Sequence, residues 1–158
     1  RKGKEEKKMT IYFDMDGTIA NLYGVENWLD YLMNEKTVPY DIASPMVDLE
    51  KLAAILEGLR AVGVRIGIIS WLSKNSSDFY KKLVTKAKKE WLKKNFPVTF
   101  DETHFVKYGT RKDYVAKDKE GILFDDDEKV REKWRGLAFN PENSDILEIV
   151  QNLKLAIS

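Results

Sequence analysis

The stretch "IYFDMDGTIA", from Ile11 to Ala20, places two aspartates and a glycine directly after a short apolar run. The segment "TIYF" (10–13) predicts a β-strand, so Asp14 and Asp16 should lie where this strand ends. An Asp-Gly pair after a strand is also a common turn. The stretch alone therefore leaves open whether these carboxylates serve catalysis or only shape a turn.

The rest of the chain alternates short β-rich segments with stretches of helical periodicity. Helices are expected at 49–59, 79–91, 127–134 and 146–153, and further strands at 64–69, 104–108, 122–124 and 136–139. Strands separated by helices form right-handed crossovers onto a mainly parallel sheet. We therefore predict an α/β, Rossmann-like fold with a mainly parallel five-stranded sheet, helices on both faces and a minimal cap insert.

The chain of 158 residues fits one domain with one hydrophobic core. Residues 1–8, "RKGKEEKK", carry mostly like charges and are expected to be a disordered or expression-derived tail. Residues 9–158 are expected to form the single domain, with a small cap-like insert at 20–48. Only about 30 residues separate the first motif from the first long helix, which suits a loop and a short helix. The binding site should accordingly be fairly open.

Composition excludes several kinds of chemistry. The chain has no cysteine and one histidine, His104, which excludes disulfides, thiol nucleophiles and Cys/His zinc sites. His104 itself is expected to be a surface or strand residue. A net charge of +1 gives no global field of the kind that marks a dedicated nucleic-acid binder. No apolar run approaches the roughly 18 residues needed to span a bilayer, so we expect a soluble, cytoplasmic protein without a membrane partner.

Polar residues follow two other predicted strands directly. Ser70 follows "IGII", and Asp125 and Asp126 follow "ILF". In parallel α/β sheets, ligands bind beyond the carboxyl ends of the strands, where these side chains would converge. Carboxylates that meet without histidine or cysteine suit a hard cation such as Mg²⁺. Taken singly, Ser70 could instead be a helix cap, and 125–127 the acidic first turn of a helix.

Together these motifs resemble a known family. "DMDGT" (14–18), Ser70, a lysine at Lys107 or Lys112, and the pair Asp125-Asp126 resemble the four motifs of the haloacid dehalogenase-like superfamily of phosphohydrolases. The resemblance covers most of the chain after Met9. The segments "SWLSK", "KYGTRK" and "LFDDDEKVREKW" are similar to small phage and bacterial 5'(3')-deoxyribonucleotidase-like proteins.

The resemblance implies a role for each motif residue. Asp14 would attack phosphorus, and Asp16 would act as general acid and base. Ser70 would hydrogen-bond a phosphoryl oxygen, and a lysine would neutralise phosphoryl charge. Lys112 is preferred over Lys107 because Gly109 ends the predicted strand and a helix could begin near Thr110. Mg²⁺ would be held by the Asp14 carboxylate, the Asp16 carbonyl, and Asp125 or Asp126.

Two further features bear on the substrate. Aromatic residues that could stack on a base lie in the insert and after the serine: Tyr23, Trp28, Tyr31, Tyr40 and Trp71. They could equally pack the insert against the core. The segment 79–96 carries a lysine face opposite Phe79, Leu83, Ala87 and Trp91, formed by Lys81, Lys82, Lys86, Lys88, Lys89, Lys93 and Lys94. A solvated face is the favoured interpretation, and a nucleic-acid contact the alternative.

These patterns predict a magnesium-dependent phosphatase acting on a small phosphorylated substrate, a (deoxy)nucleoside 5'-monophosphate above all. A phosphatase acting on a polynucleotide end is the alternative within enzymes. A metal-binding or interaction module without turnover is the alternative outside them. The presence of both Asp14 and Asp16 argues against such a module, because metal binding alone would not need the acid/base carboxyl.

Overall fold

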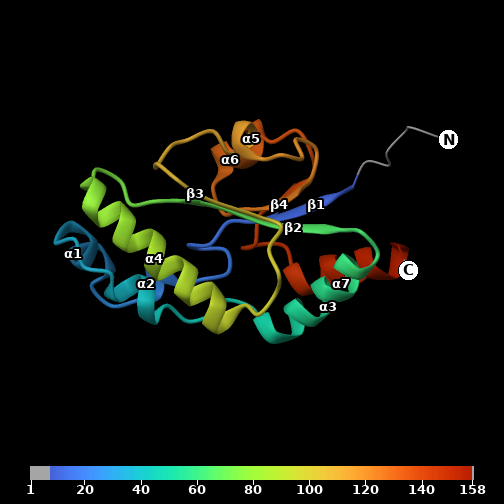
Figure 1. Ribbon diagram of the computed structural model, residues 1–158, viewed down its shortest axis with the longest axis horizontal. Helices are drawn as coiled ribbons and strands as arrows, with labels where there is room; N and C mark the ends of the chain where they lie inside the picture. The colour runs from blue at the N-terminus through green and yellow to red at the C-terminus, as the bar shows by residue number, and fades with distance from the viewer. Residues whose placement is uncertain (1–7, 158) are drawn as a thin grey trace.

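The structure is a computed structural model, and residues 8–157 of it are described. Five parallel strands form one sheet in the order β3-β2-β1-β4-β5, which confirms the predicted α/β fold (Figure 1). The strands are β1 (Thr10–Phe13), β2 (Arg65–Trp71), β3 (Glu102–Val106), β4 (Ile122–Phe124) and β5 (Ala138–Phe139). The tail predicted at 1–8 lies, apart from Lys8, outside the described residues.

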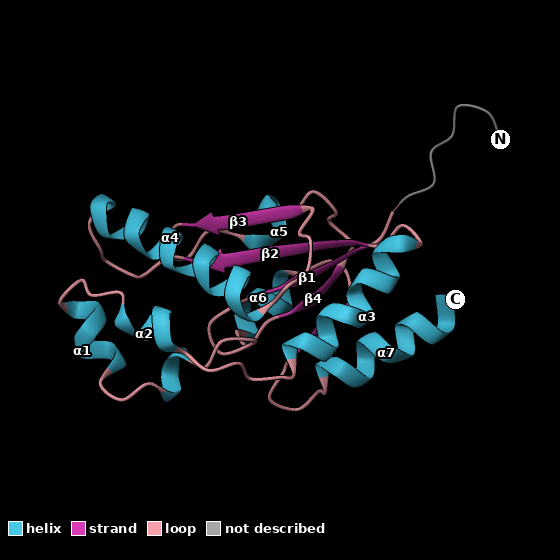
Figure 2. Ribbon diagram, turned by 60° about the horizontal axis from the view of Figure 1, so that its bottom comes forward, coloured by secondary structure: helices cyan, strands magenta, loops and turns pink. Residues whose placement is uncertain are grey.

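Helices flank the sheet on both faces: α5 and α6 lie on one side, and α3, α4 and α7 on the other (Figures 1 and 2). The helices are η1 (Leu22–Gly24), α1 (Trp28–Met33), α2 (Val38–Ile42), α3 (Leu49–Ala61), α4 (Asp78–Asn95), α5 (Lys112–Val115), α6 (Glu128–Lys133) and α7 (Ile146–Ile157). None of the helices within 8–157 combines the length and the apolar character that a membrane crossing requires.

The alternation of side chains along β1 divides the core between the two faces. Ile11 and Phe13 pack into the large cluster formed with α3 and α7. Tyr12 points the other way and packs against Trp134 in the smaller cluster. Gly67 lies opposite Tyr12 in β2, and a Cβ there would come within 2.7 Å of the tyrosine ring. The close approach of the Tyr12 ring to the β2 backbone therefore requires glycine at position 67.

Two strand boundaries differ from the prediction and move candidate site residues. β2 continues through Trp71, which pairs with Val106, so Ser70 lies inside the strand rather than after it. β3 ends at Val106, so Lys107 follows the strand instead of lying within it. Both shifts have one cause, because the β2 and β3 ladder extends until Leu72 N donates to Val106 O at 2.7 Å.

The apolar face predicted for α4 was right for Ala87 and Trp91, which are buried, and wrong in the first turns of the helix. There Phe79 is 71% exposed, and the buried residues Tyr80 and Val84 each lie one position later than predicted. The insert explains the shift. Leu22 and Tyr40 of the insert pack against Tyr80 and Val84, and Tyr80 Oη donates to Lys36 O at 2.6 Å.

Candidate functional site

The carboxylates of the predicted site meet where β1 and β4 end. Phe13 pairs with Phe124, and Asp14 N donates to Phe124 O at 2.9 Å, so the residues that follow both strands become neighbours. One carboxylate oxygen from each of Asp14, Asp125 and Asp126 lies within 4.8 Å of the other two. Sheet topology therefore brings together acids that are more than 100 residues apart in sequence.

A tight loop after β1 fixes the orientation of Asp14. Met15 O accepts hydrogen bonds from the backbone N–H groups of residues 18–20, and Thr18 Oγ1 donates to Asp14 Oδ2 at 3.0 Å. Gly17 has φ +82°, and a Cβ there would collide with the Asp126 carboxylate. Glycine thus serves both the left-handed turn and the close approach of the two acidic loops.

Lys112, at the start of α5, lies between two of these acids. Its Nζ donates to Asp14 Oδ1 at 2.8 Å and to Asp125 Oδ2 at 2.7 Å, and the residue is only 3% exposed. Although burial lowers the pKa of Lys112, the Asp14 and Asp125 carboxylates raise it above its ordinary value. Lys107 is exposed on the loop after β3. The structure therefore brings Lys112, and not Lys107, to the acidic cluster.

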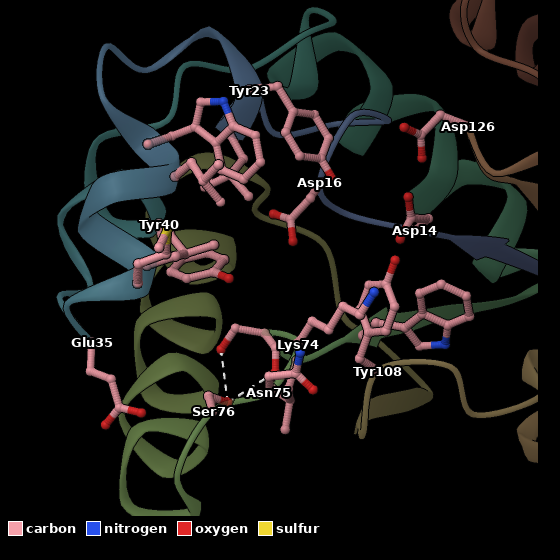
Figure 3. Close-up of a pocket in the computed structure, with 18 residues that line it drawn as sticks. Asp14, Asp16, Tyr23, Glu35, Tyr40, Lys74, Asn75, Ser76, Tyr108 and Asp126 are labelled. Atoms are coloured by element: carbon pink, nitrogen blue, oxygen red, sulfur yellow. Dashed lines mark hydrogen bonds between the residues drawn. The ribbon is translucent and has the colours of Figure 1, made fainter.

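Asp125 and Asp126 occupy different places. Asp125 is buried, and both its oxygens have partners, since Oδ2 accepts from Lys112 and Oδ1 from Asp127 N at 2.9 Å. Asp126 faces the adjoining pocket (Figure 3). Burial, with the neighbouring Asp14 and Asp125 carboxylates, raises the pKa of Asp126 to about 8. Asp126 is thus the better placed of the two to meet a ligand, and Asp125 to hold Lys112.

Asp16 has a lysine partner that was not predicted from the sequence. Lys88 extends from α4 with its side chain 1% exposed, and its Nζ donates to Asp16 Oδ2 at 2.9 Å. The same Nζ donates to Ser70 Oγ at 2.7 Å. Burial raises the pKa of Asp16, and Lys88 opposes the rise. The prediction that Lys88 belongs to a solvated lysine face was therefore wrong.

A pocket of about 580 Å³ opens beside the acids (Figure 3). We call Asp14, Asp16 and Asp126 the pocket floor. The pocket wall is the set of insert residues that line the cavity: Leu22, Tyr23, Trp28, Leu29, Leu32, Met33, Glu35 and Tyr40. The loop after β2 closes the remaining side with 72–76, and Trp71 and Tyr108 stand at the edge. Ser70 is fully buried and does not line this pocket.

The aromatic residues of the insert divide between pocket and surface. Tyr23, Trp28 and Tyr40 line the pocket, as does Trp71 after Ser70, whereas Tyr31 does not. Tyr108, for which no role was predicted, packs on Trp71 with ring centroids 4.8 Å apart. Glu35 ties the wall to α4, because its carboxylate accepts from Ser77 N at 2.9 Å and from Ser77 Oγ at 2.6 Å.

His104 lies apart from these groups. It is a half-buried residue of β3, as expected, and its Nε2 lies 2.9 Å from Glu102 Oε1.

The charge balance of the site suits a divalent cation. Four carboxylates, those of Asp14, Asp16, Asp125 and Asp126, face the ammonium groups of Lys88 and Lys112. If all are ionised, two negative charges remain uncompensated, and the donor set offers only hard oxygen atoms. Burial and the neighbouring Asp14 and Asp125 carboxylates raise the pKa of Asp126, and crowded carboxylates favour a proton or a cation. Asp14 and Asp126 could hold such an ion.

A comparison of the chain with protein-family models finds no matching model, and a search of curated proteins finds no relative.

Proposed function

We propose that the protein is a magnesium-dependent phosphatase that forms an aspartyl-phosphate, with (deoxy)nucleoside 5'-monophosphates as its substrates. One observation carries the proposal: the Asp14 carboxylate, held by Lys112 and Thr18, lies on the floor of an aromatic-walled pocket beside Asp16 and Asp126. The motif resemblance to the haloacid dehalogenase-like superfamily supports the same reaction.

The proposed reaction has two displacements at phosphorus. An Asp14 oxygen forms a bond to phosphorus while the phosphorus–ester oxygen bond breaks, and Asp16 gives its proton to the departing alkoxide. Water then attacks the same phosphorus, the bond to Asp14 breaks, and Asp16 takes the proton from water. The products are an alcohol and inorganic phosphate, and both aspartates return to their starting state. The raised pKa of Asp16 suits a carboxyl that must first carry a proton.

Lys112 and a bound metal ion would both stabilise the negative charge on the phosphoryl group. Lys112 lies 2.8 Å from Asp14 Oδ1, where its ammonium stabilises charge that spreads over the phosphoryl oxygens. Mg²⁺, when bound by Asp14 and Asp126, supplies further positive charge to the phosphate. Ser70 is fully buried outside this pocket and its hydroxyl oxygen accepts from Lys88, so a contact between Ser70 and the phosphate is not part of the proposed reaction.

The pocket wall supports a nucleoside as the group that leaves. The volume of about 580 Å³ lies within the range of sites for small organic ligands. Tyr23 and Trp28 lie edge to face with centroids 4.9 Å apart and offer a surface on which a base can stack.

A phosphate-release assay across substrate classes tests the proposal. The panel contains nucleoside 5'- and 3'-monophosphates, sugar phosphates and 5'- or 3'-phosphorylated oligonucleotides, each with Mg²⁺ and with a chelator. We expect the 5'-monophosphates to be hydrolysed fastest and the chelator to abolish the activity. Binding of Mg²⁺ without hydrolysis of any substrate would instead identify a non-catalytic metal-binding module.

One feature favours the alternative of a polynucleotide end. A second groove of about 280 Å³ shares Trp71 and Tyr108 with the first pocket. Lys129 and Lys133 line it, whereas its other cations, Arg111 and Lys112, are paired with aspartates. Such a groove could follow the next phosphates of a strand. Faster hydrolysis of phosphorylated oligonucleotides than of mononucleotides would favour this alternative.

A further inference from the structure

The side chain of Lys88 enters the site from a helix that carries no predicted catalytic motif. It is 1% exposed, and its Nζ lies within hydrogen-bond distance of three acceptors: Asp16 Oδ2 (2.9 Å), Ser70 Oγ (2.7 Å) and Trp71 O (2.6 Å). An amine has three N–H donors only when it is protonated. The geometry therefore describes an ammonium ion with every donor used, at a fixed position beside Asp16.

The hydrogen bond from Lys88 fixes the orientation of the Asp16 carboxylate. Lys88 holds Oδ2, while Oδ1 has no hydrogen-bond partner among residues 8–157 and Asp16 lines the pocket (Figure 3). Ser70 and the Trp71 carbonyl belong to β2, so the ammonium is anchored to the central sheet rather than to a mobile loop. A carboxylate held through one oxygen presents the other to a ligand in the pocket.

Stability alone does not account for a lysine at this position. A buried ion pair is on balance close to neutral compared with well-packed apolar residues, because desolvation offsets the attraction. The neighbours on the same face of α4, Val84, Ala87 and Trp91, are apolar and buried. An apolar residue would suit such a face, so the charge is better explained by what it does to Asp16.

We infer that Lys88 is a positioning residue for the proposed phosphatase reaction: its ammonium, anchored on Ser70 and the Trp71 carbonyl, holds Asp16 so that the free oxygen faces the leaving group. The inference rests on the proposed function. Lys88 does not itself touch the substrate, and it acts through Asp16. Ser70 contributes to the same arrangement by supporting Lys88.

The test compares substrates that do and do not need a proton on the leaving group. Lys88→Met preserves side-chain length but removes the charge and the donors. In single turnover, it should slow nucleoside release from a nucleoside 5'-monophosphate about 100-fold, within the range of general acid catalysis. Release of nitrophenolate from p-nitrophenyl phosphate should slow much less, because this ion departs without protonation. Equal losses on both substrates would overturn the inference.

Controls separate positioning from folding. Lys82→Met removes an exposed lysine from the same helix and should leave both rates unchanged. Ser70→Ala should slow nucleoside release in the wild-type background but add little to Lys88→Met, since both act through one ammonium. A full additional loss in the double variant would contradict the role assigned to Ser70. Thermal unfolding of each variant checks that the fold persists.

The absence of cysteine from the chain allows a chemical rescue. Lys88→Cys, alkylated with 2-bromoethylamine while unfolded and then refolded, regains an ammonium on a side chain of lysine length. This product should recover most of the lost rate relative to wild type treated identically, whereas alkylation with iodoacetamide should not. Recovery with the neutral group would overturn the inference. A wild-type protein that hydrolyses no phosphomonoester would overturn the proposed function, and this inference with it.

Discussion

The pocket floor and the pocket wall are built on different principles. Floor residues follow strands at the centre of the sheet, and hydrogen bonds to Lys112 and Lys88 hold Asp14 and Asp16. Wall residues come from short helices of the insert, where Leu29 is 52% and Met33 73% exposed. A change in the floor should therefore alter the chemical step, and a change in the wall should alter the binding of substrate.

The largest effect is expected at Asp14. Asp14→Asn replaces the nucleophile with an amide, so kcat should fall about 10³-fold or more while the fold persists. Asp78→Asn, at a side chain that is 98% exposed on α4, is the matched control and should change nothing. Steady-state phosphate release measures both variants. Retention of a tenth of the wild-type turnover by Asp14→Asn would exclude the aspartyl-phosphate route.

Lys112 should rank next, because it supports both stability and catalysis. Lys112→Met should lower kcat about 100-fold through lost charge stabilisation. It should also cost about 3 kcal/mol in the free energy of unfolding, because Asp125 is left buried and unpaired. The double variant Lys112→Met/Asp125→Asn should regain stability but not activity. Lys107→Met is the control, and an equal loss of activity there would transfer the role to Lys107.

Asp126 tests how the floor holds a metal. Asp126→Asn should raise the Mg²⁺ concentration for half-maximal activity about ten-fold or more, because an amide oxygen is a weaker ligand than a carboxylate. Asp127→Asn is the control at the neighbouring residue. Asp127 caps α6 by accepting a hydrogen bond from Val130 N, and asparagine is also a good cap. This variant should leave the Mg²⁺ requirement unchanged. A Mg²⁺ titration of activity distinguishes the two. The same requirement in both variants would remove Asp126 from the metal site.

Tyr23 tests the wall. Tyr23→Leu should raise KM for a nucleotide about five-fold, which corresponds to the ~1 kcal/mol at the low end of base stacking, with little change in kcat. Tyr23 is 52% exposed, so the core should tolerate the change. Tyr31→Leu is the matched control, because Tyr31 lies on α1 outside the pocket. Glycerol phosphate, which has no base, should show no difference, and an equal rise in its KM would argue against stacking.

The same contrast explains how much could be predicted from the sequence. Asp14, Asp125 and Asp126 were predictable as neighbours because each lies within two residues of the end of an apolar strand in a parallel sheet. The buried face of the first turns of α4 was not predictable, because it depends on contacts such as the one between Tyr80 and Lys36, 44 residues apart. With the phase set by Tyr80, Val84 and Trp91, Lys88 falls within the buried face. A lysine inside an apolar stripe was the signal available in the sequence.

The smallest effect is expected on the exposed lysines of α4. Lys82, Lys86 and Lys89 point away from the buried face of the helix, and none of them lines the pocket. Reversing all three charges to glutamate should change kcat/KM for a mononucleotide less than about two-fold, because exposed charges are screened within about 10 Å at 0.1 M salt. Lys129→Glu/Lys133→Glu, in the second groove, is the comparison. If either set of changes weakens hydrolysis of a phosphorylated oligonucleotide and flattens its salt dependence, the substrate extends beyond the pocket along that surface. If neither set of charge reversals changes hydrolysis of the mononucleotide or of the oligonucleotide, substrate recognition is confined to the pocket floor and the pocket wall.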